Sequence, residues 1–319
     1  MSRPHRPDFI IVGAPKAGTT ALHSALAQHP EVFTSDPKEP KYWLCGDAPP
    51  PHWTGPGDAH SQQEWVWRRR DYDALFTPAA DHQVRGESTP FYLWSRPAHR
   101  RIAEHLPDVK LIAVVRDPID RAYSNWMHLW SDGLESVPEF ERAFRRQQQR
   151  IDDGWAPFWR YKDLGLYGEQ LKHLYSYVDP AQVLVVRYKD IVEMPAETVD
   201  RVCRFLGIGE SHLSEIPRDN THDYAEPGWR TEVFGPVVRV GAWLGQFAPP
   251  EIWRAVSVPI IAQLSSGEAH RPKLAPEVRE RLVPHFADDI ALLSELTGED
   301  FSLWTSSESR GSFRERASR

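Results

Sequence analysis

The first segment whose residues could bind and activate a ligand is "GAPKAGTT" (13–20), which follows the apolar run "FIIV". A strand that turns through glycines into a helix points several backbone N–H groups at one spot, which suits a phosphate group. Lys16 precedes the second glycine, Gly18, whereas the lysine of a nucleotide hydrolase follows it. At this forward position a lysine lies beside the bridging oxygen that gains negative charge when the terminal group of a bound anion departs. The sequence therefore predicts a lysine that both binds an anion and assists its transfer, although an incidental lysine in a strand–turn–helix junction is the plainer alternative.

A second anion-binding pattern occurs in "VVRDPIDRAYSNW". Arg116 ends the apolar run 110–116, and Ser124 follows eight residues later inside a predicted helix. Ligands of open α/β sheets bind at the carboxyl ends of the strands. We therefore expect Arg116 and Ser124 to lie at the same sheet edge as the loop 13–20.

These residues need strands and helices to position them. Short, continuous apolar runs at 8–14, 110–116 and 182–188 predict strands covered on both faces, and 84–88 is a weaker fourth. Two segments after these strands have apolar residues at helical spacing. The first has Ile119, Ala122, Tyr123, Trp126 and Trp130, and the second has Val278, Leu282, Phe286, Ile290 and Leu293. Alternating strands and helices predict an α/β fold with a parallel sheet flanked by helices.

The length of 319 residues allows one large domain, which we place at 1–304. A mainly helical segment at about 225–264 is predicted to form a cap, and the Pro- and Gly-rich stretch 46–57 a long loop. The tail 305–319 has one aromatic residue and no periodicity, so we expect it to be disordered.

Composition excludes several classes of protein. The net charge of −7 argues against a surface that tracks nucleic acid, although a basic pocket for a small anion stays compatible. Cys45 and Cys203 have no CxxC or Cys/His spacing, so neither a disulfide framework nor a zinc site is predicted. Because no apolar stretch reaches the 18 residues that a membrane span needs, we expect a cytoplasmic protein.

Taken together, "PKAGTT" after the first strand and Arg116 with Ser124 after a central strand resemble the sulfotransferases that use 3′-phosphoadenosine 5′-phosphosulfate (PAPS). The resemblance implies a P-loop-type sheet, a metal-free enzyme and the product 3′-phosphoadenosine 5′-phosphate (PAP). It also implies transfer of a sulfuryl group to a hydroxyl or, less often, an amine. By position, Arg116 and Ser124 would hold the 3′-phosphate, and the 5′ side would be lined by Lys16, Ala17, Gly18, Thr19 and Thr20.

Two later segments resemble the same family. "SGEAHRPKLAPEVRERL" (266–282) is similar to the loop that closes over the nucleotide, which would assign Arg271 and Lys273 to the donor. "LGLYGEQL" (164–171) resembles the segment whose tyrosine, here Tyr167, approaches the 3′-phosphate or the adenine. A helical tyrosine that merely fills the core is the alternative.

"KEPKYW" (38–43) resembles the heparan sulfate sulfotransferase-like and bacterial carbohydrate or natural-product branches, in which the glutamate is the general base. Sulfuryl transfer needs a proton removed from the nucleophile, so Glu39 is the predicted base. A solvated glutamate paired with a neighbouring lysine is the alternative. Glu87 in "GESTPFYLW" is the second candidate for the base, which would place it against the acceptor. A histidine base also stays open, with candidates at His99, His105, His128 and His222.

The acceptor is less defined by the sequence. We expect a small molecule, a sugar or a glycosylated natural product, whose ring would stack on Tyr42, Trp43, Trp155 and Trp159. The alternative is that these rings fill the core. The identity of the acceptor, O- against N-sulfation and the oligomeric state are not determined by the sequence.

Two other functions compete with this hypothesis. A P-loop kinase or nucleotide hydrolase would need Mg²⁺ held by a Ser or Thr directly after the loop lysine, where this chain has Ala17. Asp117 and Asp190 follow strands and could hold a metal, but each could equally cap a helix. A catalytically inactive nucleotide-binding module ranks third, because it gives Lys16 no function.

Overall fold

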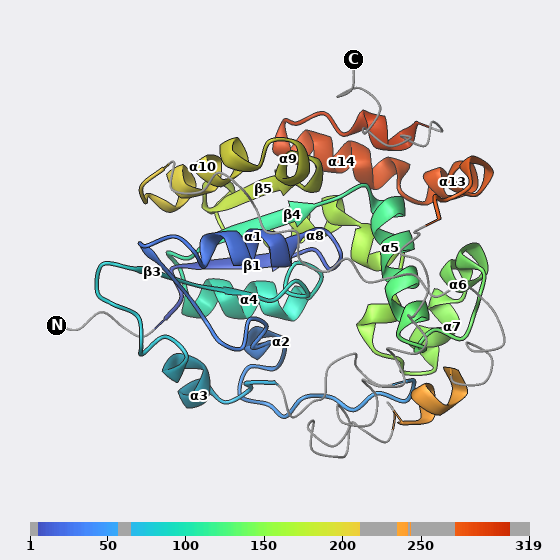
Figure 1. Cartoon of the computed structure of the whole chain (residues 1–319), viewed down its shortest axis with the longest axis horizontal. Coiled ribbons are helices and arrows are strands. Elements are labelled where there is room, and N and C mark those ends of the chain that lie inside the picture. Colours follow the sequence, from blue (N-terminus) through green and yellow to red (C-terminus); the bar gives the residue numbers. More distant parts are fainter. Residues whose placement is uncertain (1–5, 57–64, 211–234, 242, 244–271, 307–319) are drawn as a thin grey trace.

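The structure is a computed structural model, and it describes residues 6–56, 65–210, 235–241, 243 and 272–306 (Figure 1). Five strands form one sheet in the order β2-β3-β1-β4-β5, and every neighbouring pair is parallel. The strands are β1 Phe9–Gly13, β2 Val32–Thr34, β3 Val84–Ser88, β4 Lys110–Val115 and β5 Val183–Arg187. The predicted parallel α/β sheet is confirmed. The sequence did not reveal β2, because a three-residue strand has too few residues for a pattern.

Helices connect and cover the strands. The α-helices before β5 are α1 Thr19–Leu26, α2 Tyr42–Cys45, α3 Arg69–Ala74, α4 Arg96–His105, α5 Pro118–Ser131, α6 Phe140–Arg145, α7 Gln147–Asp152 and α8 Tyr167–Leu174. After β5 come α9 Tyr188–Glu193, α10 Pro195–Leu206, α13 Pro276–Leu282 and α14 Ala287–Thr297. Short 3-10 turns cover Pro157–Trp159, Asp163–Gly165, Pro180–Gln182, Val283–His285 and Ser302–Thr305.

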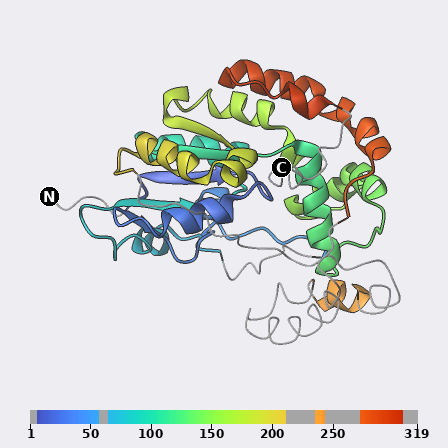
Figure 2. The same cartoon turned by 45° about the horizontal axis from the view of Figure 1, so that its top comes forward.

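The connections place helices on both faces of the sheet. Helix α1 packs against α10 on one face, and α4 packs against α8 on the other. Helix α14 lies along the outer side of α8, as both views show (Figure 2). Strand β1 is the central strand, and all five of its residues are buried. Because β1, β4 and β5 are parallel, their carboxyl ends bring the following loops to one edge of the sheet.

The C-terminal helical pattern differs from the prediction of one continuous face. Pro284 lies in the 3-10 turn Val283–His285, which separates α13 from α14. A proline cannot donate the backbone hydrogen bond that a continuous helix needs, so the pattern divides into two helices. Leu282 and Phe286 still bury their side chains in the shared core.

Other expectations meet the structure only in part. Most of the predicted cap lies outside the described residues, although 235–241 is helical. The tail beyond residue 306 lies outside them too, while Ser302–Thr305 forms a 3-10 turn. Cys45 and Cys203 are buried free thiols. Among the described helices, none has the length and apolar composition to cross a membrane.

Candidate active site

The loop between β1 and α1 has the backbone shape of an anion site. Lys16 has φ of 62° and Gly18 has φ of 95°, so the chain turns sharply before α1 begins at Thr19. No side chain caps α1 at its start, and its first N–H groups have no partner inside the helix. A Cβ at position 18 would lie 2.7 Å from Cδ2 of Tyr188. The loop therefore needs glycine there, and its backbone fits a phosphate or sulfate group.

Arg116 meets this loop at the end of β4. Its Nη1 lies 3.4 Å from the carbonyl oxygen of Lys16, and its guanidinium lies 4.7 Å from the ring centre of Tyr188. Ser124 is buried on α5, two turns further on. Tyr188 thus contacts both Gly18 and Arg116 and joins the two predicted anion-binding segments. Tyr188 was not among the predicted site residues, although it ends the apolar run 182–188 and so lies at the carboxyl end of a strand.

A buried group of donors lies next to Arg116. Tyr167 is 1% exposed, and in the described part of the chain its hydroxyl has no hydrogen-bond partner. Arg121 is fully buried and donates to Oδ1 of Asn125 at 3.1 Å and to the carbonyl of Tyr161. Burial, with a smaller effect of Arg116, lowers the pKa of Arg121 to about 10. In the described part of the chain, Nε of Arg121 has no hydrogen-bond partner, so this cation fits an added anionic group nearby.

Tyr167 is held in place by the C-terminal helix α14. The carboxylate of Asp289 accepts the backbone N–H groups of Gly168 and Glu169, both at 2.9 Å. A Cβ at Gly168 would lie 2.5 Å from the carbonyl oxygen of Asp289, so α8 and α14 can meet this closely only at a glycine. The "LYG" sequence therefore places Tyr167, the tyrosine predicted to contact the sulfate donor, directly before a close helix contact.

Lys38 and Glu39 lie beside the second threonine of the loop. Nζ of Lys38 donates to Oγ1 of Thr20 at 2.9 Å and to Oε1 of Glu39 at 3.1 Å. Nearby, Nδ1 of His23 lies 2.8 Å from Oγ of Ser88. Burial, and then the ammonium of Lys38, lower the pKa of His23 to about 4, so this ring is neutral at pH 7. Glu39 is therefore paired with a neighbouring lysine, as in the alternative interpretation, and this lysine joins it to the loop. The function of Glu39 as the base stays a prediction.

Glu87 does not have the predicted acceptor-side position. It is fully buried, and its carboxylate accepts the hydroxyls of Tyr72 at 2.8 Å, Tyr92 at 3.0 Å and Thr89 at 2.7 Å. Burial raises the pKa of Glu87 to about 7, although the three hydroxyl donors act in the opposite direction. A carboxylate with both oxygens occupied in the core cannot contact an acceptor, so that prediction was wrong.

Glu87 instead supports the segment that carries Glu39. Thr89, which donates to Glu87, accepts the backbone N–H of Lys41 at 3.3 Å. The backbone N–H of Ser88 donates to the carbonyl of Lys38 at 3.2 Å. Both ends of the segment 38–41 are therefore fixed to the end of β3.

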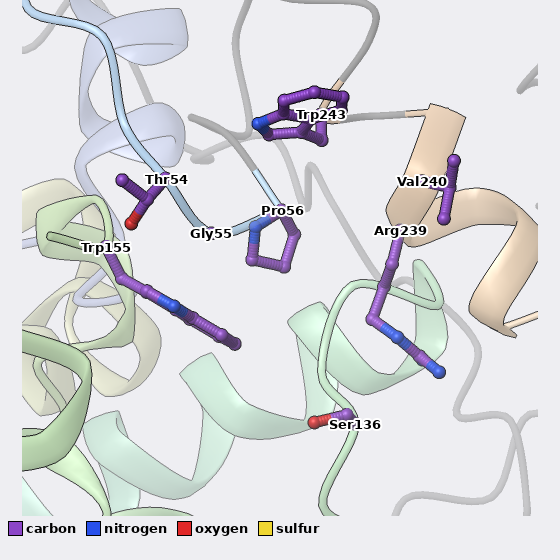
Figure 3. Close-up of a pocket in the computed structure, with 8 residues that line it drawn as sticks. All are labelled: Thr54, Gly55, Pro56, Ser136, Trp155, Arg239, Val240 and Trp243. Atoms are coloured by element: carbon purple, nitrogen blue, oxygen red, sulfur yellow. The ribbon is translucent and has the colours of Figure 1, made fainter. Parts of the chain in front are cut away.

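The four aromatic residues assigned to the acceptor separate into core and surface. Tyr42, Trp43 and Trp159 are each at most 2% exposed and belong to the hydrophobic core, so stacking on an acceptor was wrong for these three. Trp155 is half-buried and packs edge-on against Trp159, with ring centres 5.7 Å apart. It borders a pocket of about 370 Å³ (Figure 3). The pocket is lined by Thr54, Gly55, Pro56, Ser136, Trp155, Arg239, Val240 and Trp243.

The late basic loop is only partly described. Arg271 lies outside the described residues, and Lys273 is exposed. A different arginine joins this region to the site: Arg279 of α13 is 5% exposed and donates to both carboxylate oxygens of Asp117. Asp117 also accepts the N–H groups of Ile119 and Asp120 at the start of α5. Its carboxylate is therefore used by a helix cap and an ion pair, which argues against the metal-ligand role that a kinase would require.

The histidine candidates lie in other surroundings. His99 is 1% exposed, and its ring nitrogens contact Nδ1 of His173 and the carbonyl of Leu93, both at 2.9 Å. Burial lowers the pKa of His99 to about 4. His128 of α5 lies near Asp132, and His222 is outside the described residues.

Among the described residues, no cluster of three or more His, Cys, Asp or Glu side chains could hold a metal ion.

Comparisons with known proteins agree with this geometry. The sequence model of the Sulfotransferase family matches residues 7–211. The chain is 33% identical over 203 residues to heparan sulfate glucosamine 3-O-sulfotransferase 6 of Homo sapiens, which covers 63% of this chain and 52% of that protein. It is 28% identical over 216 residues to bifunctional heparan sulfate N-deacetylase/N-sulfotransferase 4 of Mus musculus, covering 64% of this chain and 22% of that protein. The chain thus spans about half of the length of the first relative and less than a quarter of the second.

A solved structure matches over almost the whole chain. A sulfotransferase from Alicyclobacillus acidocaldarius superposes with a TM-score of 0.71 at 28% sequence identity. The match covers 94% of this chain and 99% of the other. The likeness extends well beyond the residues that the family model matches.

Proposed function

We propose that this chain, which belongs to the sulfotransferase family, is an enzyme that transfers a sulfuryl group from PAPS to a hydroxyl group of a sugar or other ring-bearing acceptor. The observation that carries the proposal is the meeting of two anion-binding segments at Tyr188, which contacts both Gly18 and Arg116. PAPS carries one anionic group at each end of its ribose, so it requires two such segments. The donors of Arg121 and Tyr167 support a 3′-phosphate next to Arg116.

The residues divide the chemistry between them. Glu39 takes the hydroxyl proton of the acceptor as the acceptor oxygen bonds to sulfur. Lys16 stabilises the 5′-phosphate oxygen, which keeps the electron pair of the broken sulfur–oxygen bond. The backbone N–H groups at the start of α1 bind the phosphate throughout. Positive side chains and backbone dipoles supply the charge that a kinase would take from Mg²⁺.

A ring-bearing acceptor is supported by the pocket at Trp155. An aromatic face packs well on the flat face of a sugar or aryl ring, and Arg239 offers a hydrogen-bonding cation across the same pocket (Figure 3). The relatives that act on heparan sulfate support the carbohydrate class. We extend that class, and not their particular substrates, to this chain.

The test is mass spectrometry of a panel of sugars and aryl glycosides incubated with the protein, PAPS and a chelator. A mass gain of one sulfuryl group, absent with the Glu39→Gln variant, is the expected result. ATP with Mg²⁺ is the matched comparison. Phosphoryl transfer from ATP, without sulfuryl transfer from PAPS, would replace this proposal with the kinase function.

A further inference from the structure

The geometry points to a catalytic function for Lys38: we propose that its ammonium holds Glu39 while the donor is absent and contacts the sulfuryl oxygens once the donor binds. This inference rests on the proposed function. Lys38 lies in the segment 38–43, but the sequence predicted a catalytic function only for Glu39 of that segment.

The position of Nζ is the first argument. It lies 2.9 Å from Oγ1 of Thr20, which is the second residue of α1 and belongs to the predicted 5′ side. It lies 3.1 Å from Oε1 of Glu39, the predicted base. A single ammonium therefore contacts the anion loop and the base at the same time. A sulfuryl group held by that loop would come within reach of Nζ.

The weakness of the existing ion pair is the second argument. Both side chains are 23% exposed, so the pair is partly open to solvent, and screening by water reduces its net contribution to stability. A hydrogen bond from the ammonium to a bound donor is charge-assisted as well, and the ligand shields it from the water that screens the present pair. The ammonium is therefore expected to move to the donor, after which Glu39 is no longer held by Lys38.

The surroundings are the third argument. The segment that carries Lys38 and Glu39 is fixed through its backbone, by Ser88 at one end and Thr89 at the other. The two side chains can therefore change partners while the main chain stays in place. His23, whose pKa responds to the charges of both Lys38 and Glu39, is neutral at pH 7 and adds no second cation beside Lys38.

The exchange gives the reaction an order. Without the donor, Glu39 is paired and a poor proton acceptor. With the donor, the same ammonium reduces the negative charge on the sulfuryl oxygens, and Glu39 can accept the hydroxyl proton. The hydroxyl proton then goes to Glu39, and the electron pair of the broken sulfur–oxygen bond stays on the 5′-phosphate oxygen. Lys38 neither gains nor loses a proton.

Calorimetry with PAPS and PAP, with a chelator and without acceptor, tests the inference, because only PAPS carries the sulfuryl group. Lys38→Met should weaken PAPS by about tenfold, which is about 1.4 kcal/mol, because breaking the Glu39 pair offsets part of the gain. PAP affinity should change by less than about twofold. Lys38→Arg keeps a cation and should recover most of the loss. Arg116→Ala is the control and should weaken both nucleotides alike.

Equal weakening of PAPS and PAP by Lys38→Met, or no change in either, would overturn the function assigned to Lys38 and leave the proposed function intact. If the unmodified protein binds neither nucleotide, the proposed function fails, and the inference fails with it. Thermal unfolding of each variant separates a loss of binding from a loss of fold.

Discussion

Gly168→Ala tests the contact that positions Tyr167. The added Cβ would lie 2.5 Å from the carbonyl oxygen of Asp289 and 3.0 Å from the backbone nitrogen of Leu293. Both atoms are backbone, so no side chain can rotate away. Helix α14 must therefore move from α8, and the two hydrogen bonds from Gly168 and Glu169 to Asp289 lengthen.

The size of the effect follows from opposing contributions. Overpacking costs about 1–3 kcal/mol, and weakening hydrogen bonds to a carboxylate costs about 1.5–3 kcal/mol. Replacing a helical glycine by alanine stabilises the helix by about 0.5–1 kcal/mol. We expect the free energy of unfolding to fall by roughly 1.5–5.5 kcal/mol, which lowers Tm by about 3–22 °C. Because Tyr167 adjoins the altered residue, PAP affinity should fall as well.

Thermal unfolding and calorimetry with PAP are the assays, and Gly298→Ala is the matched control. Gly298 has φ of 69°, and an added Cβ would have no heavy atom within 4 Å, so this variant carries only backbone strain, about 1–2 kcal/mol. Gly168→Ala should be the less stable of the two and the only one that weakens PAP. A Gly168→Ala protein as stable as the parent would refute the close contact, since helix propensity alone predicts a small gain.

Four further predictions concern the site itself. Lys16→Ala should keep the fold but lower turnover by more than about tenfold in a steady-state assay, because the lost contact strengthens as the leaving oxygen gains charge. Arg116→Ala should weaken PAP at least about tenfold more than adenosine 5′-phosphosulfate, which lacks the 3′-phosphate, as measured by calorimetry. Glu39→Gln should lower turnover by about 10²–10⁴-fold with donor affinity unchanged. Glu87 binds its proton more tightly when folded, with a pKa of about 7 against 4.5 for the free side chain. The stability that Glu87 contributes is therefore complete below pH 4.5 and is lost as the pH rises through about 7. Urea unfolding of the parent and of Glu87→Gln across this pH range should show the difference in their free energies of unfolding fall.

Each of these predictions has a contrary outcome. Activity of Lys16→Ala within about tenfold of the parent would leave Lys16 as a binding residue only. Equal weakening of PAP and adenosine 5′-phosphosulfate by Arg116→Ala would reject the 3′-phosphate assignment. Near-full activity of Glu39→Gln would place the base elsewhere. A stability difference for Glu87→Gln that rises with pH would contradict the burial effect on that carboxyl group.

The central sheet and the shape of the loop 13–20 could be predicted because their signals are local. Strands β1 and β4 are covered on both faces, so each reads as a continuous apolar run whatever surrounds it. The turn after β1 needs a glycine at position 18 for its backbone conformation, and glycine is visible in the sequence. Lys16 and Arg116 follow these strands directly, so chain connectivity alone brings them to one edge.

The tertiary structure decided which side chains could act. Glu39 and Glu87 are each followed by a proline within three residues, yet one is paired with Lys38 beside the loop and the other is fully buried. Trp155 and Trp159 are four residues apart, yet only Trp155 borders a pocket. Burial depends on partners that are distant along the chain, as when Tyr72 donates to Glu87 across fifteen residues and α14 supplies Asp289 to α8. No local pattern contains those partners, because only folding brings them together.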